Sequence, residues 1–142
     1  MEKTYQHNVA VIALATEGIQ RGVDRNIRKI SGEIRTKRTS ENVKLQKWNE
    51  QMGCGNIPVD YSRVQSIVDS LKESMGKCFD VGYAQTMIAV LQQDVQSNEL
   101  GMQRSTIPAI RNHARVSARN ANNEVCRLQR WVDQKGSMVA SQ

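Results

Sequence analysis

The chain has 142 residues, of which 39% are hydrophobic and only 4% aromatic, and its formal net charge is +6. This length is enough for one domain, and few aromatic residues combined with 23 Asn and Gln residues favour a thin apolar seam over a thick globular core. The sequence therefore predicts an all-α protein with long amphipathic helices, arranged as an extended antiparallel helical hairpin or a three-helix bundle. We expect residues 1–142 to form a single helical domain.

The first predicted element is one long amphipathic helix over residues 6–52. Its apolar residues recur at steps of three, four and seven, and they fall on one face of a helix. Val11, Leu14 and Val43 lie off that face and indicate a second contact surface. A helix cannot bury such a face alone, so we expect it to pack against other helices. The predicted helix-packing seam consists of Ile12, Ile19, Val23, Ile27, Ile30, Ile34, Leu45 and Trp48.

Glycine and proline mark the end of that helix and the start of the next. Gly53, Gly55 and Pro58 predict a break near residues 53–59, because proline cannot continue a helix and glycine permits the left-handed conformation that ends one. A second helix is expected over residues 60–98. Its apolar face changes side after Gly82, which indicates either a kink or break near residues 76–82 or a helix packed on different faces at its two ends.

A third helix is predicted over residues 106–134, followed by a short polar tail. Ser105 or Thr106 followed by Pro108 is a helix-start signal, since a hydroxyl group caps the helix and proline is tolerated in its first turn. Alanines occupy the centre of its apolar face, so its partner must approach closely there. Gly136 is expected to end this helix.

Charge is unevenly distributed, and arginines form two stripes on the predicted helices. Residues 1–58 carry a net +4, residues 59–103 a net −3 and residues 104–142 a net +5. The three segments could neutralise one another, or the surplus charge could attract an acidic partner such as nucleic acid, lipid headgroups or another subunit. The candidate phosphate or subunit contacts are Arg21, Arg25, Arg28 and Arg35 in one stripe, and Arg111, Arg115 and Arg119 in the other.

The sequence offers no recognisable catalytic, cofactor or metal site. Gly76-Lys77-Cys78 lacks the other residues of a phosphate-binding loop. His7 and His113 are not paired with a cysteine or carboxylate at ligand spacing. Cys54, Cys78 and Cys126 form no pair typical of a disulfide framework, and we expect three reduced thiols, with Cys54 the most reactive. We therefore predict a protein that is not an enzyme and needs no cofactor.

The apolar run Val9–Ala15 is too short for a transmembrane segment, and we do not expect it to be a cleaved signal peptide. Reduced cysteines favour synthesis in the cytoplasm.

In composition, the chain resembles small helical proteins rich in Gln, Ala and Arg that form structural or internal parts of phage particles and secretion machines. This likeness implies a basic structural protein that oligomerises through helix packing, as a virion or secretion-apparatus component. The alternatives are a nucleic-acid-binding or packaging-associated protein and a helical chaperone for a partner helix. The expected partners are further copies of the chain or a larger protein assembly, with nucleic acid as a second candidate.

Overall fold

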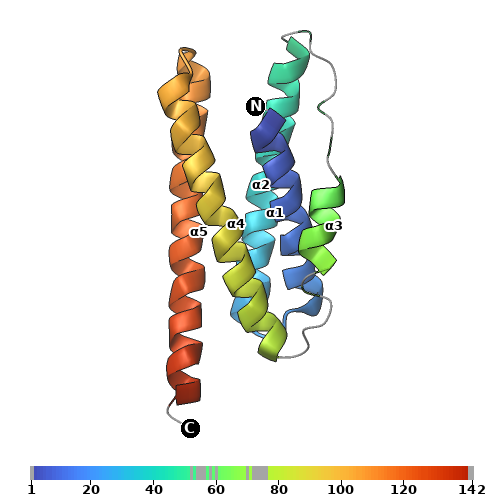
Figure 1. Ribbon diagram of the computed structural model, residues 1–142, viewed down its shortest axis with the longest axis vertical. Coiled ribbons are helices and arrows are strands. Elements are labelled where there is room, and N and C mark those ends of the chain that lie inside the picture. Colours follow the sequence, from blue (N-terminus) through green and yellow to red (C-terminus); the bar gives the residue numbers. More distant parts are fainter. Residues whose placement is uncertain are drawn as a thin grey trace. The chain divides into compact units, whose positions relative to one another are not determined.

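The protein is all-α, as predicted. The computed structural model describes residues 2–51, 53, 57, 59, 61–69, 71 and 77–140, and within them it contains five helices and no strand. The helices are α1 (Glu2–Arg21), α2 (Arg25–Gln51), α3 (Tyr61–Asp69), α4 (Lys77–Arg104) and α5 (Pro108–Ala140) (Figure 1). The chain divides into two compact units, Met1–Tyr83 (unit 1) and Ala84–Gln142 (unit 2), and α4 contributes to both.

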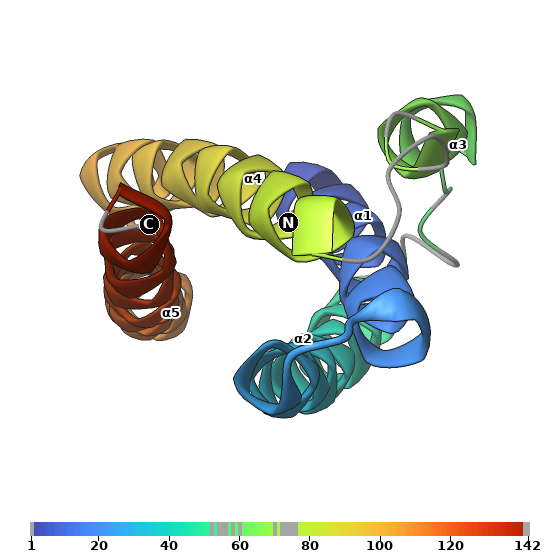
Figure 2. The same cartoon turned by 90° about the horizontal axis from the view of Figure 1, so that it is seen from below.

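Unit 1 is built on the antiparallel pair α1 and α2, which lie side by side along their lengths (Figure 1). The short helix α3 packs against α1 (Figure 2). The apolar residues buried in α2 are Ile27, Ile30, Ile34 and Leu45. Burial of such side chains is the main stabilising contribution to a helix pair of this kind.

The prediction of one helix over residues 6–52 needs correction, because the chain turns between Arg21 and Arg25. The side chain of Asp24 caps α2: its Oδ1 accepts hydrogen bonds from the backbone N–H of Asn26 at 2.8 Å and of Ile27 at 3.4 Å. The carboxylate of Asp80 accepts hydrogen bonds from the N–H of Val23 at 2.9 Å and of Asp24 at 2.8 Å. The backbone N–H groups of residues 23, 24, 26 and 27 therefore donate to carboxylates, one of which comes from α4.

This turn also changes which face of α1 is buried. Val11 and Leu14 are completely buried, although the long-helix interpretation placed them off the main seam. Ile12 and Ile19 are only half-buried, Trp48 in α2 is half-buried, and Val23 lies in the turn with 54% of its surface exposed. Because the chain turns between the two helices, the buried face of α1 is not in line with the buried face of α2. The seam was predicted for one continuous helix and therefore named the wrong face of α1.

The first turns of α4 pack onto α1 and α2 through Tyr83. The Tyr83 hydroxyl and the Ser31 hydroxyl are hydrogen-bonded at 2.7 Å, and both side chains are buried. Gly18 leaves space for this contact, because a Cβ at residue 18 would clash with both the Tyr83 ring and the Ser31 Oγ. The Tyr83 ring also stacks on Phe79, with 5.8 Å between centroids.

Unit 2 consists of the remainder of α4 and the antiparallel helix α5, joined by residues Ser105–Ile107. The backbone N–H of Ile107 donates to Ser105 Oγ at 3.2 Å in this connection. A Cβ at Gly101 would lie 3.8 Å from the Cβ of Ala114, so small residues bring the two helices close together at this end. The buried alanines of α5 are Ala114, Ala118 and Ala121.

The single helix predicted over residues 60–98 is two helices in the structure, because α3 ends at Asp69 and α4 begins at Lys77. Helix α4 continues through Gly82 and ends at Arg104, beyond the predicted end at residue 98, and α5 continues past Gly136 where a polar tail was expected. Gly53 has a φ of 76°, which is the conformation expected of a glycine that ends a helix. Cys54, Gly55, Pro58 and Gly76 lie outside the described residues. Over the part of the chain that the structure describes, no helix is long and apolar enough to span a membrane.

Candidate functional site

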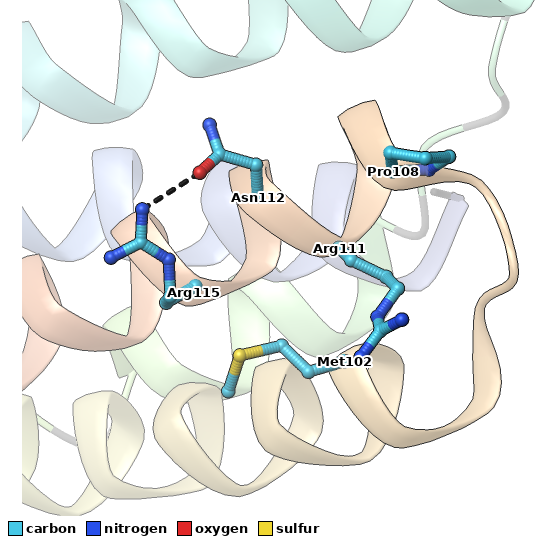
Figure 3. A pocket seen from close by; sticks show the side chains of 5 residues that line it. All are labelled: Met102, Pro108, Arg111, Asn112 and Arg115. Atoms are coloured by element: carbon cyan, nitrogen blue, oxygen red, sulfur yellow. Dashed lines mark hydrogen bonds between the residues drawn. The ribbon is translucent and has the colours of Figure 1, made fainter.

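An open pocket of about 320 Å³ lies in unit 2, where α4 meets α5 (Figure 3). Met102 of α4 contributes a thioether side chain, and the other lining residues come from the first two turns of α5. One of the two lining arginines, Arg115, donates a hydrogen bond to Asn112 Oδ1 at 2.8 Å. The complete lining is Met102, Pro108, Arg111, Asn112 and Arg115.

The surroundings of this pocket are strongly basic. Residues 100–123 contain four arginines and no Asp or Glu, and all four arginines are exposed. Three of them, Arg111, Arg115 and Arg119, repeat every four residues along α5, as the sequence predicted for the second stripe. Guanidinium groups bind carboxylates and phosphates, so this end of unit 2 suits an anion and disfavours a metal cation at Met102.

The first arginine stripe is divided by the turn between α1 and α2. Arg21 is half-buried; its guanidinium lies 4.5 Å from the Phe79 ring centroid and 3.6 Å from a Glu17 carboxylate oxygen. Arg28 donates hydrogen bonds to the carbonyl oxygens of Gly22 and Val23 at 3.1 and 2.7 Å. These two side chains therefore stabilise the fold of unit 1, while Arg25 and Arg35 extend from the exposed face of α2.

A buried polar cluster between α1 and α2 was missed by the sequence interpretation. Arg38 is completely buried, and its Nη1 lies 3.5 Å from Glu41 Oε2 and 3.4 Å from Asn8 Oδ1. Asn8, also completely buried, donates to Glu41 at 3.2 Å and to Asn42 at 3.0 Å. Asn42 in turn donates to the backbone carbonyl of Tyr5 at 3.3 Å. The cluster joins the two helices through polar contacts inside the unit.

A signal for this cluster was present in the spacing. Ile34, Arg38, Glu41 and Leu45 are separated by four, three and four residues, so the charged pair occupies seam positions on α2. The predicted seam passes from Ile34 to Leu45 and leaves out Arg38 and Glu41, since charged residues are rarely fully buried unless they are paired. Asn8, which accepts a hydrogen bond from the buried Arg38, belongs to α1. The spacing of residues within α2 cannot reveal it.

Metal-binding side chains are scattered in the described part of the chain. There, no three His, Cys, Asp or Glu side chains come together in a group that could hold a metal ion. His7 is buried in unit 1, and His113 of α5 lies 3.4 Å from the Ser117 hydroxyl. Cys126 is exposed on α5. Cys54 and the side chain of Cys78 lie outside the described residues.

The fold is shared with solved structures of CopM, at low sequence identity. The structure titled "CopM in the Cu(I)-bound form" has 18% identity and a TM-score of 0.81, with 94% of this chain and 92% of that chain covered. The Cu(II)-bound form has 16% identity and the same TM-score, with 94% and 93% covered. The apo form has 18% identity, a TM-score of 0.81 and the same two coverages as the Cu(II) form. No curated relative matches the sequence.

These comparisons correct the function expected from composition. The expectation of a basic, structural virion or secretion-apparatus subunit is wrong, because the matching structures are of a protein solved with copper and silver. The alternatives of a nucleic-acid-binding or packaging-associated protein and of a helix chaperone gain no support from these comparisons. A family model, described as a domain of unknown function (DUF4142), matches residues 1–117. The chain therefore belongs to the DUF4142 family.

Proposed function

We propose that this protein is a non-enzymatic metal-handling protein that binds a soft monovalent cation, Cu(I) or Ag(I), as its cargo. The observation that carries the proposal is the fold: 94% of the chain aligns with CopM, whose structures hold copper and silver. The low identity means that the ligands must be sought in this chain's own residues.

The chain's own donors favour a soft metal. The described residues lack a group of three His, Cys, Asp or Glu, which is the kind of site that Zn(II) or Cu(II) prefers. The sequence does contain two closely spaced pairs of sulfur donors, Met52 with Cys54 and Met75 with Cys78. Thiolate and thioether sulfur select Cu(I) over harder ions. The proposal therefore assigns the metal to these sulfur pairs, which lie in the sequence on either side of α3.

A competition experiment tests this assignment. The reduced full-length chain is titrated anaerobically with Cu(I) in the presence of a chromogenic Cu(I) chelator, and with Ag(I) in parallel. We expect the wild-type chain to withdraw Cu(I) from the chelator. The Cys54→Ser/Cys78→Ser variant should lose the metal to the chelator at concentrations where the wild type retains it. Zn(II) should bind far more weakly than Cu(I), since sulfur pairs without further ligands suit a soft ion.

The third cysteine provides the matched control. Cys126 is exposed on α5, distant in sequence from both pairs, and Cys126→Ser removes a thiol that the proposal does not assign to the metal. We expect this variant to bind Cu(I) as the wild type does. Met52→Leu/Met75→Leu conserves side-chain volume while removing both thioethers, and it should weaken binding less than loss of the thiolates. A wild-type chain that cannot compete for Cu(I), or equal losses in the Cys54→Ser/Cys78→Ser and Cys126→Ser variants, would refute the proposal.

A further inference from the structure

We propose that the end of unit 2 where α4 meets α5 docks onto an anionic lipid surface. Two large apolar side chains are left in solvent there: Leu100 is 46% exposed and Ile107 49% exposed. They lie next to exposed arginines on both helices. We call this region the hairpin tip and define it as Leu100, Arg104, Ile107, Pro108, Arg111 and Arg115.

The charge at the hairpin tip is of one sign over a long stretch. The acidic residues nearest to it in sequence are Glu99, which is exposed on α4, and Glu124, which is buried with 2% of its surface exposed. Between them the chain carries only positive formal charges. The four arginines of this stretch therefore outnumber the one exposed carboxylate beside them, and a net attraction for an anionic surface remains.

The spacing of these residues places apolar and basic groups in sequence along each helix. Ile107, Arg111 and Arg115 follow one another at intervals of four residues, and Leu100 precedes Arg104 by the same interval. The backbone N–H of Arg111 donates to the carbonyl of Ile107 at 3.0 Å, so Ile107 is held in register with the first turn of α5. Each helix thus carries an apolar side chain and a guanidinium one turn apart, with the guanidinium nearer the connection on α4 and farther from it on α5.

On α5 this order fits the layers of a membrane surface, and on α4 the long Arg104 side chain is able to reach back toward the phosphates. At a bilayer interface, apolar side chains enter the boundary between headgroups and acyl chains, while basic side chains remain at the phosphates. The pocket beside Arg111, with Met102 and Pro108 in its wall, offers space for a headgroup next to a guanidinium (Figure 3). A nucleic acid would satisfy the arginines but would leave Leu100 and Ile107 in water, which is why we commit to lipid.

Vesicle co-sedimentation of the full-length chain tests the proposal. Vesicles of phosphatidylcholine alone are compared with vesicles that also contain phosphatidylglycerol, at low and high ionic strength. We expect binding to the anionic vesicles, weak binding to the neutral ones, and a decrease as salt is added. Arg111→Gln/Arg115→Gln should lower the partition coefficient about 30-fold, the value expected for removal of two arginines from an anionic surface.

Matched variants distinguish binding through the hairpin tip from binding through the overall positive charge of the chain. Arg25→Gln/Arg35→Gln removes the same charge from exposed positions on α2 and should change the partition coefficient by about twofold or less. Leu100→Ser/Ile107→Ser should lower the partition coefficient about tenfold through loss of apolar contact. Val43→Ser removes an exposed apolar side chain from α2, where Val43 is 52% exposed, and should have no effect. Circular dichroism and thermal melts confirm that each variant is folded.

Three results would overturn the proposal. They are no binding of the wild type to anionic vesicles, equal losses in the hairpin-tip and α2 arginine variants, and full binding after removal of Leu100 and Ile107. Salt-sensitive retention of duplex DNA without vesicle binding would assign the arginines to nucleic acid instead. Cys54→Ser/Cys78→Ser should bind vesicles as the wild type does. Vesicle binding therefore tests this proposal independently of the metal-binding proposal.

Discussion

Unit 1 and unit 2 use arginine differently. In unit 1, Arg38 is completely buried with Glu41 and Asn8, and Arg21 packs over the Phe79 ring. In unit 2, the arginines from Arg104 to Arg119 are exposed, and the buried ionisable groups are the carboxyls of Asp94 and Glu124. A buried charge needs its partners inside the fold, whereas an exposed one is available to a partner molecule. The two units therefore differ in what their arginines can do.

Removal of Arg38 should have the largest effect on stability. Arg38→Ala leaves Glu41 and Asn8 buried without their guanidinium partner, and we expect the free energy of unfolding to fall by about 3–5 kcal/mol. Arg35→Ala, three residues earlier on the exposed face of α2, should change it by less than about 0.5 kcal/mol. Urea denaturation followed by circular dichroism measures both.

An apolar replacement of the whole pair distinguishes charge loss from volume loss. Arg38→Met/Glu41→Leu fills similar space without charge, and buried ion pairs replaced in this way often cost little stability. We expect this double variant to be more stable than Arg38→Ala. Equal destabilisation in the two would show that packing around Arg38, rather than its charge, holds α1 and α2 together.

Gly18→Ala should be the next most damaging change. The new Cβ would overlap the Tyr83 ring and the Ser31 hydroxyl, both of which are buried, so the start of α4 would have to move. Overpacking of this kind costs about 1–3 kcal/mol. Gly32→Ala is the control, since a Cβ there meets nothing within 4 Å. It should raise the melting temperature, because alanine favours a helix over glycine by about 1 kcal/mol.

Asp80→Asn should have a smaller and more local effect. The amide retains one oxygen acceptor but loses the charge, so one of the bonds from the Val23 and Asp24 N–H groups is lost or weakened. The expected cost is about 1–2 kcal/mol. Hydrogen exchange should show faster exchange at the amides of residues 23 and 24 specifically. Asp133→Asn is the control: Asp133 is exposed on α5 and should leave those amides unchanged.

Much of the fold could be predicted from local patterns. The repeats of apolar residues predicted helices without strands, and Ser105 with Pro108 placed the α4–α5 connection within a few residues of its position. The turn at residues 22–24 was not found, because one of the carboxylates that satisfies it, Asp80, lies more than 50 residues away in sequence. Gly22 and Asp24 were its only local signals.

The candidate site was predicted in part. The arginines at 111, 115 and 119 were named from their spacing, and the structure places them on the exposed face of α5. The pocket was not expected, because Met102 belongs to another helix and only the hairpin brings it beside Arg111. Arg38 was missed for the same reason, since Asn8 comes from a second helix. In both units, the missing information is which side chain of a second helix lies opposite.

The smallest expected effect on stability comes from removing the exposed arginines of unit 2. Arg111→Gln/Arg115→Gln removes two positive charges, one more than Arg38→Ala, yet both side chains are exposed and the hydrogen bond from Arg115 to Asn112 lies at the surface. We expect the free energy of unfolding to change by less than about 0.5 kcal/mol. Helicity should also persist, since glutamine is nearly as good a helix former as arginine. A loss comparable to that of Arg38→Ala would mean that these arginines hold unit 2 together, and they would then not be free to meet an anionic surface.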